Sequence, residues 1–375
     1  MTAPVLFEEL TADNGKRIGI ITLSAEKTLN ALTLEMVNLM LQQLGQWQHD
    51  NNIACVLVKG AGVRAFCAGG DVQCLHQSAV ERPGGPCHYA EDFFTREYRL
   101  DYLFHTYPKP VICWGHGIVM GGGVGVMAAC SHRVATEKTR IAMPEITIAL
   151  YPDVGGSWFL NRMPGKSGVF LALTGAAING ADSLFTDLAD YFLSQDQYES
   201  VVNALLIQPW STLYQHNHDI VSELLTVVSA NSSDALPEGR VESHLETINQ
   251  LCDGDDVVAI INAIIDIETE DQWLAKASAN LMTGSPLSGL IIYHQLQVSR
   301  KMTLAQVFRS EIQLSTNIVR YPEFAEGVRA LLIDKDRNPL WQFKTVEEVP
   351  ADLLSRFFVA PTLGSTWPAN PLADL

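Results

Sequence analysis

The pattern of apolar and polar positions predicts alternating strands and helices in the first part of the chain. Residues 17–23 (RIGIITL) and 53–60 (IACVLVKG) are continuous apolar runs with the length of a buried strand. Between them, Thr33 precedes the amphipathic segment LEMVNLMLQQLGQW and is predicted to cap the start of a helix. The order strand, helix, strand indicates parallel strands joined by helical crossovers.

The same alternation continues beyond these elements and then ends. A turn and a polar loop precede a helix predicted near 90–106 and a strand, PVICWG, predicted at 110–115. From about residue 195 onward strand patterns nearly disappear, while stretches such as DDVVAIINAIIDIE and PLSGLIIYHQLQVSRKM have helical periodicity. We therefore predict an α/β fold in two parts, a core over residues 1–200 and a mainly helical region over residues 201–375.

Charge narrows the range of binding partners. The 375 residues include 25 Lys and Arg against 42 Asp and Glu, a formal net charge of −17. This excess of negative charge argues against nonspecific binding to nucleic acid or to anionic lipid, and a polyanionic ligand would need a local basic patch. No run of about 18 apolar residues is present, so no membrane span is predicted.

Two further features of composition concern the cellular compartment. The first residues, MTAPVLFEELTADNGKR, include two glutamates and no apolar stretch of signal-peptide length, so we expect a cytoplasmic protein. The seven cysteines form no CxxC pair, and we expect them to be reduced and mostly buried.

Two glycine-rich turns each follow a predicted strand: AFCAGGD at 65–71 and GHGIVMGGGVGVMAA at 115–129. Glycine allows the backbone to approach a ligand closely, and a helix that begins at such a turn directs unpaired N–H groups outward. Two of these donors converging on one oxygen would form an oxyanion hole. The alternative is that the glycines serve only tight chain reversal or close helix packing.

The second turn also fits a dinucleotide-binding fingerprint. Gly123, Gly125 and Ala128 match G-x-G-x-x-A after a strand, and Glu145 lies twenty residues beyond Gly125. The acidic residue of that motif should end a second strand, whereas Glu145 follows Pro144, a residue more natural at the start of a helix. We therefore favour the oxyanion-hole interpretation.

Two carboxylates, Glu145 and Asp153, flank the apolar stretch in MPEITIALYPDVGGSW. Each has a structural interpretation: Glu145 could complement a helix dipole, and Asp153 could be an ordinary N-cap. The apolar residues between them would instead hold both acids beside a dry cavity, where the pKa of a carboxyl group rises and its basicity grows. Two such acids near an oxyanion hole would form a hydrolytic site.

Other catalytic patterns are not found. The serine-hydrolase sequence G-x-S-x-G is absent, and His216 and His218 lack a third ligand nearby, so no metal site is predicted. His116 lies inside the second glycine turn, where we interpret it as a packing or hydrogen-bonding residue rather than a catalytic one.

The segments AFCAGGD, HGIVMGGGVG, MPEITIALYPDVGGSWFLNRMPG and EFAEGVRALLIDKDRNPLW together resemble the crotonase (enoyl-CoA hydratase/isomerase) superfamily, from about residue 5 to 350. The resemblance implies a spiral of ββα units over residues 1–200 that binds acyl-CoA. It also implies that the helical region over residues 201–375 covers the pocket or joins subunits of a homo-oligomer, a trimer or hexamer. An acyl-CoA substrate is then expected, without metal or redox cofactor.

The resemblance assigns roles within the motifs. It makes the N–H groups of Gly70 and Gly122 the oxyanion-hole donors and Glu145 and Asp153 the catalytic acids. Hydratases of the superfamily carry a glutamate at the position of Gly125 and usually a glycine at that of Asp153. The exchange of one acid for another indicates the thioester-hydrolysing branch, acting on a short-chain 3-hydroxyacyl-CoA.

The substrate-binding residues are also inferred from the resemblance. Glu97, in the predicted helix DFFTREYRLDYLF, matches a glutamate that contacts substrate in this branch, although an exposed helix face is the alternative. Lys27 and Arg64 lie beside positions that meet the CoA phosphates, and Ala68 lies in the first turn; both cations could equally be ordinary surface charges. Two other functions stay open: a hydratase or isomerase of the same fold, and a noncatalytic acyl-CoA binder.

Overall fold

The computed structural model describes residues 3–361 and 369–375, and its chain forms two compact units. Each unit is assembled from separate stretches of sequence. The first unit contains Met1–Gly70, Leu100–Ile141 and Ile178–Glu242, and the second contains Asp71–Arg99, Ala142–Ala177 and Ser243–Leu375. The division near residue 200 stays a prediction.

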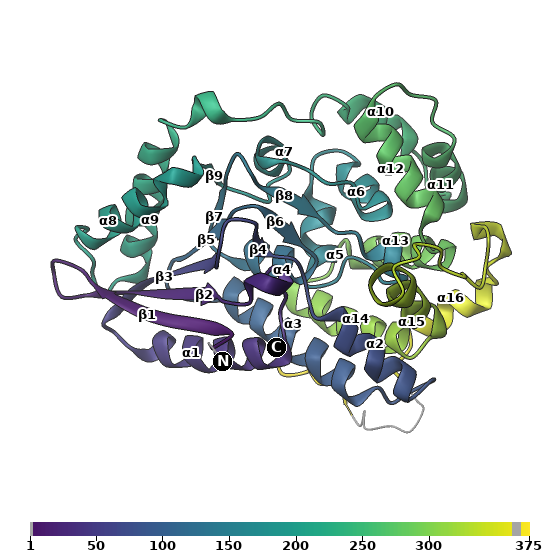
Figure 1. Cartoon of the computed structure of the whole chain (residues 1–375), viewed down its shortest axis with the longest axis horizontal. Helices are drawn as coiled ribbons and strands as arrows, with labels where there is room; N and C mark the ends of the chain where they lie inside the picture. The colour runs from purple at the N-terminus through teal and green to yellow at the C-terminus, as the bar shows by residue number, and fades with distance from the viewer. Residues whose placement is uncertain (1–2, 362–368) are drawn as a thin grey trace. The chain divides into compact units, whose positions relative to one another are not determined.

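The first unit is built on two sheets (Figure 1). The larger has the strand order β1-β2-β3-β5-β7-β9; β1 and β2 are antiparallel and the other neighbouring pairs are parallel. The smaller has the order β4-β6-β8. The strands are β1 (Val5–Thr11), β2 (Arg17–Leu23), β3 (Ile53–Gly60), β4 (Ala65–Cys67), β5 (Val111–Gly115), β6 (Ile118–Met120), β7 (His132–Ala135), β8 (Arg140–Ala142) and β9 (Tyr191–Phe192).

The chain alternates between these two sheets. Each of β3, β5 and β7 lies in the larger sheet and is followed directly by a strand of the smaller one, β4, β6 or β8. The first two of these strand pairs lead straight into a helix, which gives the predicted repetition of ββα units. The predicted strands and their parallel order are confirmed. Strand β1, whose sequence mixes polar and apolar residues without clear alternation, was not predicted.

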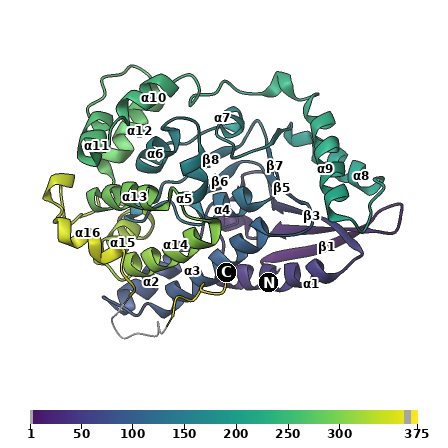
Figure 2. The same ribbon diagram turned by 180° about the vertical axis from the view of Figure 1, so that it is seen from behind.

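Helices and a shared apolar core hold the larger sheet in place. The helices of the first unit are α1 (Leu34–His49), α4 (Gly122–Ala129), α7 (Gly180–Phe185), α8 (Tyr198–Leu206) and α9 (Tyr214–Ser229). As predicted, Thr33 caps α1, its side chain accepting a hydrogen bond from Met36 N. Seen from behind in Figure 2, α8 and α9 lie beside the sheet, and α9 contacts β3 and β9.

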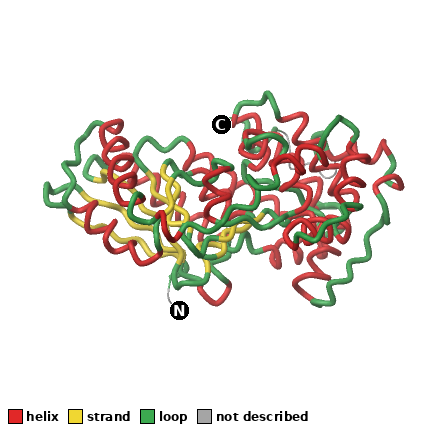
Figure 3. Tube along the Cα trace, turned by 90° about the horizontal axis from the view of Figure 1, so that it is seen from above, coloured by secondary structure: helices red, strands yellow, loops and turns green. Residues whose placement is uncertain are grey.

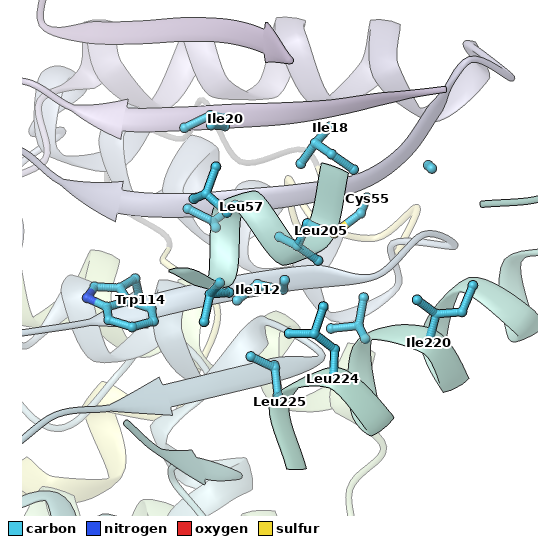
Figure 4. Close-up of a cluster of buried hydrophobic side chains, with 14 of the residues drawn as sticks. Ile18, Ile20, Cys55, Leu57, Ile112, Trp114, Leu205, Ile220, Leu224 and Leu225 are labelled. Atoms are coloured by element: carbon cyan, nitrogen blue, oxygen red, sulfur yellow. The ribbon is translucent and has the colours of Figure 1, made fainter. Parts of the chain in front are cut away.

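Figure 4 shows the core that these two helices form with the sheet. Ile18, Leu57 and Ile112 from three adjacent strands meet Leu205 of α8 and Leu224 of α9, and all five side chains are buried. Strands β2 and β3 are buried along almost their whole length. Burial on both faces is why these strands are continuous apolar runs rather than alternating ones.

The second unit is predominantly helical, as predicted for the latter part of the chain, and Figure 3 shows its helices in red. Aspartate, serine or threonine side chains cap the starts of α11 to α14. The helices of the second unit are α2 (Val72–Glu81), the 3-10 helices η2 (Glu145–Ile148), η3 (Leu160–Arg162) and η7 (Val346–Glu348), α5 (Gly156–Phe159), α6 (Ser167–Thr174), α10 (Leu245–Leu251), α11 (Val257–Ile265), α12 (Gln272–Thr283), α13 (Pro286–Ser299), α14 (Leu304–Val319), α15 (Pro322–Val328), the π-helix η6 (Arg329–Ile333) and α16 (Ala351–Phe357). Helix α3 (His88–His105) begins in this unit and ends in the first.

Across residues 3–361 and 369–375, each helix is either too short or too polar to cross a membrane.

Candidate functional site

The two glycine turns lie side by side in the first unit. Strands β4 and β6 are parallel neighbours, so the turns that follow them leave the same edge of the smaller sheet. Gly69 has φ +106°, and a Cβ built on it would lie 3.8 Å from Gly122 N. A Cβ on Gly123 would overlap the Cys67 carbonyl oxygen and lie 2.8 Å from Cys67 Cβ. Gly69 is therefore required by its positive φ, and Gly123 by the close approach of Cys67.

The second turn also begins a helix, as predicted. Gly122 is the first residue of α4, so its N–H group has no acceptor within the helix. Gly70 immediately precedes Asp71, whose side chain caps α2 by accepting a hydrogen bond from Cys74 N. The N–H groups proposed as oxyanion donors thus belong to residues at or just before the start of a helix.

The dinucleotide-binding alternative does not fit this geometry. Gly125 and Ala128 lie inside α4 rather than in the turn before it, and Glu145 begins η2 instead of ending a strand. The two ring nitrogens of His116 lie 3.3 Å from the Trp114 carbonyl oxygen and 3.1 Å from that of Gly62. His116 therefore has the hydrogen-bonding role predicted for it.

The three predicted CoA-binding residues of the first unit differ in how exposed they are to solvent. Ala68 is half-buried, and its N–H donates to the carbonyl of Leu29, two residues after Lys27. Lys27 and Arg64 are both exposed, Lys27 in a short 3-10 helix and Arg64 just before β4. Their exposure suits either a phosphate contact or a plain surface charge, and their role stays a prediction.

The second unit holds the predicted acids in one buried group, which we call the acid cluster: Glu97, Glu145 and Asp153. Their exposed fractions are 2%, 5% and 4%. Glu97 lies on α3, Glu145 begins η2, and Asp153 lies in the loop between η2 and α5. The alternative of an exposed helix face for Glu97 is therefore wrong.

Asp153 does not act as a helix cap; its side chain is held by hydroxyl groups. Tyr98 Oη donates to Asp153 Oδ2 over 2.6 Å and lies 2.6 Å from Ser315 Oγ. Ser315 Oγ also lies 2.9 Å from Tyr151 Oη. A chain of hydroxyls thus runs from α14 to the Asp153 carboxylate.

Burial and mutual repulsion raise the pKa values of the acid cluster. Desolvation raises the pKa of Glu145 well above its ordinary value, and the charge of Asp153 raises it further. The pKa of Glu97 is raised by desolvation and then by the charges of Asp153 and Glu145. Desolvation raises the pKa of Asp153 to about 6, against the lowering effect of the Tyr98 hydrogen bond. These shifts make Glu145 a stronger base than an exposed glutamate.

Two oxygen atoms of this cluster are buried and unpaired among the described residues. Within the described part of the chain, Glu97 Oε1 and Glu145 Oε2 are buried without a hydrogen-bond partner. Buried polar atoms are usually paired, and such exceptions commonly mark catalytic groups. The cluster can therefore accept protons from, or hydrogen-bond to, a molecule that enters it.

Four residues of the second unit were missed by sequence reasoning: Tyr98, Tyr151, Glu311 and Ser315. Tyr98 and Tyr151 resemble ordinary apolar positions of their segments, and α14 carries Glu311 and Ser315 more than 150 residues after Asp153. No signal in the sequence connects α14 with the acids. Among the described residues, groups of three or more His, Cys, Asp or Glu positioned to hold a metal ion are absent.

Comparison with known proteins shows to which protein family the chain belongs. The profile described as enoyl-CoA hydratase/isomerase matches residues 18–358, and the chain belongs to this family. The predicted crotonase membership and fold are confirmed. Two solved structures support the fold, each 31% identical: a carnitinyl-CoA dehydratase from Mycobacterium thermoresistibile (TM-score 0.83, covering 97% of this chain and 100% of that chain) and an enoyl-CoA hydratase from Rhodobacter sphaeroides 2.4.1 (TM-score 0.81, 96% and 98%).

Within the family, the chain is similar to proteins named 3-hydroxyisobutyryl-CoA hydrolase, mitochondrial. The Xenopus tropicalis protein is 38% identical over 91% of this chain and 86% of its own length. The Danio rerio protein is 37% identical over 94% and 89%, and the Homo sapiens protein 35% identical over 96% and 90%. The predicted resemblance to this branch is confirmed. Because these relatives are named as mitochondrial, the expected cytoplasmic location stays a prediction.

Proposed function

We propose that this protein hydrolyses the thioester of a short-chain 3-hydroxyacyl-CoA, first 3-hydroxyisobutyryl-CoA and second 3-hydroxypropionyl-CoA. The observation that carries the proposal is the buried pair Glu145 and Asp153, in which each carboxyl has a raised pKa and Glu145 Oε2 has no partner among the described residues. Glycine at position 125 supports hydrolysis over hydration, and the names of the relatives agree with this choice.

In the proposed reaction the thioester carbonyl accepts hydrogen bonds from the N–H groups of Gly70 and Gly122. Glu145 either removes a proton from water as it attacks the carbonyl carbon, or attacks that carbon itself to give a mixed anhydride that water then cleaves. On either route a tetrahedral oxyanion forms and collapses by breaking the carbon–sulfur bond. The CoA thiolate is a good leaving group, so the step needs no strong general acid.

The other predicted residues bind the substrate in this proposal. Asp153 and Glu97 orient the 3-hydroxyl group or the attacking water. Lys27 and Arg64 supply the local positive charge that a CoA phosphate needs on a chain of net charge −17, and Ala68 is a further substrate-binding residue. No metal or redox cofactor takes part. We further propose a homo-oligomeric, trimeric or hexameric, cytoplasmic enzyme of valine breakdown.

The decisive experiment follows free thiol release from 3-hydroxyisobutyryl-CoA by the purified protein, with isobutyryl-CoA and crotonyl-CoA as parallel substrates. Release that depends on the 3-hydroxyl group supports the proposal. Hydration of crotonyl-CoA without thiol release would instead support the second candidate, a hydratase, which is favoured by the 31% identity to a structure named enoyl-CoA hydratase. Tight binding of all three substrates without turnover would indicate an acyl-CoA binder.

We expect Asp153→Asn to reduce the preference for 3-hydroxyisobutyryl-CoA over isobutyryl-CoA. A site that hydrogen-bonds a substrate hydroxyl discriminates strongly against analogues lacking it, because its own polar groups are then left unpaired. Removing the carboxylate should therefore lower the ratio of kcat/KM values for the two substrates by about tenfold or more, as for the loss of a hydrogen bond to a charged group. An unchanged ratio would exclude Asp153 from recognition of the hydroxyl.

The pH dependence of hydrolysis should reflect ionisation of Asp153. Its pKa is raised to about 6, so the carboxylate that the proposal requires is present above this pH and is lost as the pH falls. Glu145 must be ionised as well, and its pKa is also raised, so we expect kcat/KM to fall by at least about tenfold for each pH unit below about 6. Tyr98→Phe removes the hydrogen bond that stabilises the carboxylate, so it should move this acid limb to higher pH.

Tyr107→Phe is a matched control for this pH profile. Tyr107 is also a buried tyrosine, but its hydroxyl donates to the backbone carbonyl of Leu44, 2.9 Å away, within the first unit. Its substitution should leave the acid limb in place. An equal shift in both variants, or none in Tyr98→Phe, would contradict the assignment of the limb to Asp153.

A further inference from the structure

Another buried carboxylate, Glu311 on α14, lies close to the loop that carries Asp153. Its exposed fraction is 0%. Glu311 Oε2 accepts a hydrogen bond from Gly155 N over 2.8 Å, and Oε1 accepts one from Ser157 N over 3.1 Å. Both oxygens are therefore committed to backbone N–H groups, which leaves this carboxylate poorly placed to act on a substrate itself.

The backbone that Glu311 binds is strained. Val154 directly follows Asp153 and has φ +52°, a left-handed conformation that is unfavourable for a β-branched residue. Gly155 continues in the left-handed region with φ +82°. Strained backbone of this kind persists only where surrounding contacts impose it, and the two hydrogen bonds that Gly155 N and Ser157 N donate to Glu311 are such contacts.

The same helix also reaches the side chain of Asp153. Ser315 lies four residues after Glu311 and so on the same face of α14. It contacts Tyr98 Oη, which in turn donates to Asp153 Oδ2. In addition, the carbonyl of Glu311 accepts a hydrogen bond from Tyr151 Oη over 2.9 Å. Helix α14 thus holds the backbone after Asp153 through Glu311. It also holds the Asp153 carboxylate, through Ser315 and Tyr98.

We propose that Glu311 is a positioning residue that sets substrate specificity by fixing the turn at residues 153–157. Without the two hydrogen bonds, Val154 relaxes toward a favourable conformation and Asp153 leaves the position from which it recognises the 3-hydroxyl group. The inference rests on the proposed function, because it concerns the discrimination that Asp153 exerts. Its consequence is that specificity depends on a helix far along the chain that supplies no group to the substrate.

The test compares the kcat/KM ratio for 3-hydroxyisobutyryl-CoA over isobutyryl-CoA in wild type, Glu311→Gln and Glu311→Asp. The glutamine amide presents an NH2 group to one of the two backbone N–H groups, so Glu311→Gln should lower the ratio about tenfold or more, because that buried donor is left without an acceptor. Aspartate keeps the carboxylate, and Glu311→Asp should retain more discrimination than Glu311→Gln. A purely structural role would lower the active fraction for both substrates equally and leave the ratio unchanged.

Two further variants make the test specific. In an Asp153→Asn background, Glu311→Gln should change the ratio by less than about twofold, since residues acting as a unit are not additive. Glu323→Gln is the matched control, because Glu323 is another buried glutamate that accepts from a hydroxyl, Ser285 Oγ, and a backbone N–H, that of Gln342. It should keep the wild-type ratio.

The outcomes separate the inference from the proposed function. Folded Glu311→Gln with the wild-type ratio, or effects of Glu311→Gln and Asp153→Asn that multiply, would overturn the positioning role. If Glu311→Gln does not fold, the ratio in Glu311→Asp relative to Glu323→Gln decides. If wild-type protein releases no thiol, the proposed function is wrong but the positioning role can still be tested. The ratio of affinities for the two CoA esters, measured by calorimetry in wild type and the variants, then replaces the kcat/KM ratio.

Discussion

Glu145→Gln is expected to abolish thioester hydrolysis while the protein stays folded. A positioned general base contributes about 10²–10⁴-fold to a rate, and the amide can neither accept the proton nor attack the carbonyl. We therefore expect kcat for 3-hydroxyisobutyryl-CoA to fall by about a thousandfold with little change in KM. Free thiol release under saturating substrate measures the first quantity, and its concentration dependence the second.

Unlike its activity, the stability of the Glu145→Gln variant should not fall. Because the pKa of Glu145 is raised in the folded state, its contribution to the free energy of unfolding is full below its ordinary value near 4.5 and is lost as the pH rises through the folded-state pKa. Glutamine carries no charge to desolvate. Thermal unfolding near pH 8 should thus show Glu145→Gln at least as stable as wild type, whereas general misfolding would lower both stability and activity.

Two results would redirect the assignment of Glu145. Retention of more than about a tenth of wild-type kcat is incompatible with a base worth at least about 10²-fold, and would move that role to Asp153 or Glu97. Glu323→Gln, the buried control already described, should keep most of the turnover of its folded fraction. Single-turnover hydrolysis in ¹⁸O-labelled water tests for the nucleophilic route, because a mixed anhydride cleaved by water at the Glu145 carbonyl carbon places the label in the Glu145 side chain, whereas general-base attack of water places it in the released acid.

The second large effect is expected from Gly123→Ala. The added methyl group would collide with Cys67 in the neighbouring turn, so the backbones of the two turns must separate. Gly122 N and Gly70 N would then no longer be directed as the proposal requires. Loss of one oxyanion-hole donor typically costs about 10²–10³-fold in kcat, and we expect a loss in this range. Steady-state thiol release measures it.

Gly45→Ala is the matched control for that substitution. Gly45 lies in the middle of α1, and a Cβ there would have no neighbouring atom within 4 Å. Alanine should therefore leave kcat unchanged and raise the free energy of unfolding by about 0.5–1 kcal/mol, as expected for glycine replaced in a helix interior. Equal kcat in Gly123→Ala and wild type would show that the close approach of the turns is not needed for catalysis.

Local sequence patterns determined much of the fold. Residues 17–23 and 53–60 are apolar on both faces, so their place in a parallel sheet is visible without any partner strand. The cap at Thr33 and the helical periodicity after residue 195 depend on neighbours within a few positions and were equally predictable. Strand β1 was missed because it is an edge strand with exposed polar residues, which apolar periodicity does not detect.

Some features of the candidate site could likewise be predicted from local sequence, and others could not. Gly70, Gly122, Glu145 and Asp153 lie within short motifs, and their chemistry could be read from those motifs alone. The burial of Glu97 and the hydroxyl chain to Asp153 could not be read, because they depend on how separate helices pack.

Glu311 shows this limit most clearly, since it meets Gly155 and Ser157 across more than 150 residues of intervening chain. A sequence encodes periodicity and local capping directly, but the partner of a buried polar group is selected by packing between distant segments. The candidate reactive groups could therefore be identified from local motifs, whereas the residues that hold them in place follow from the packing of distant helices.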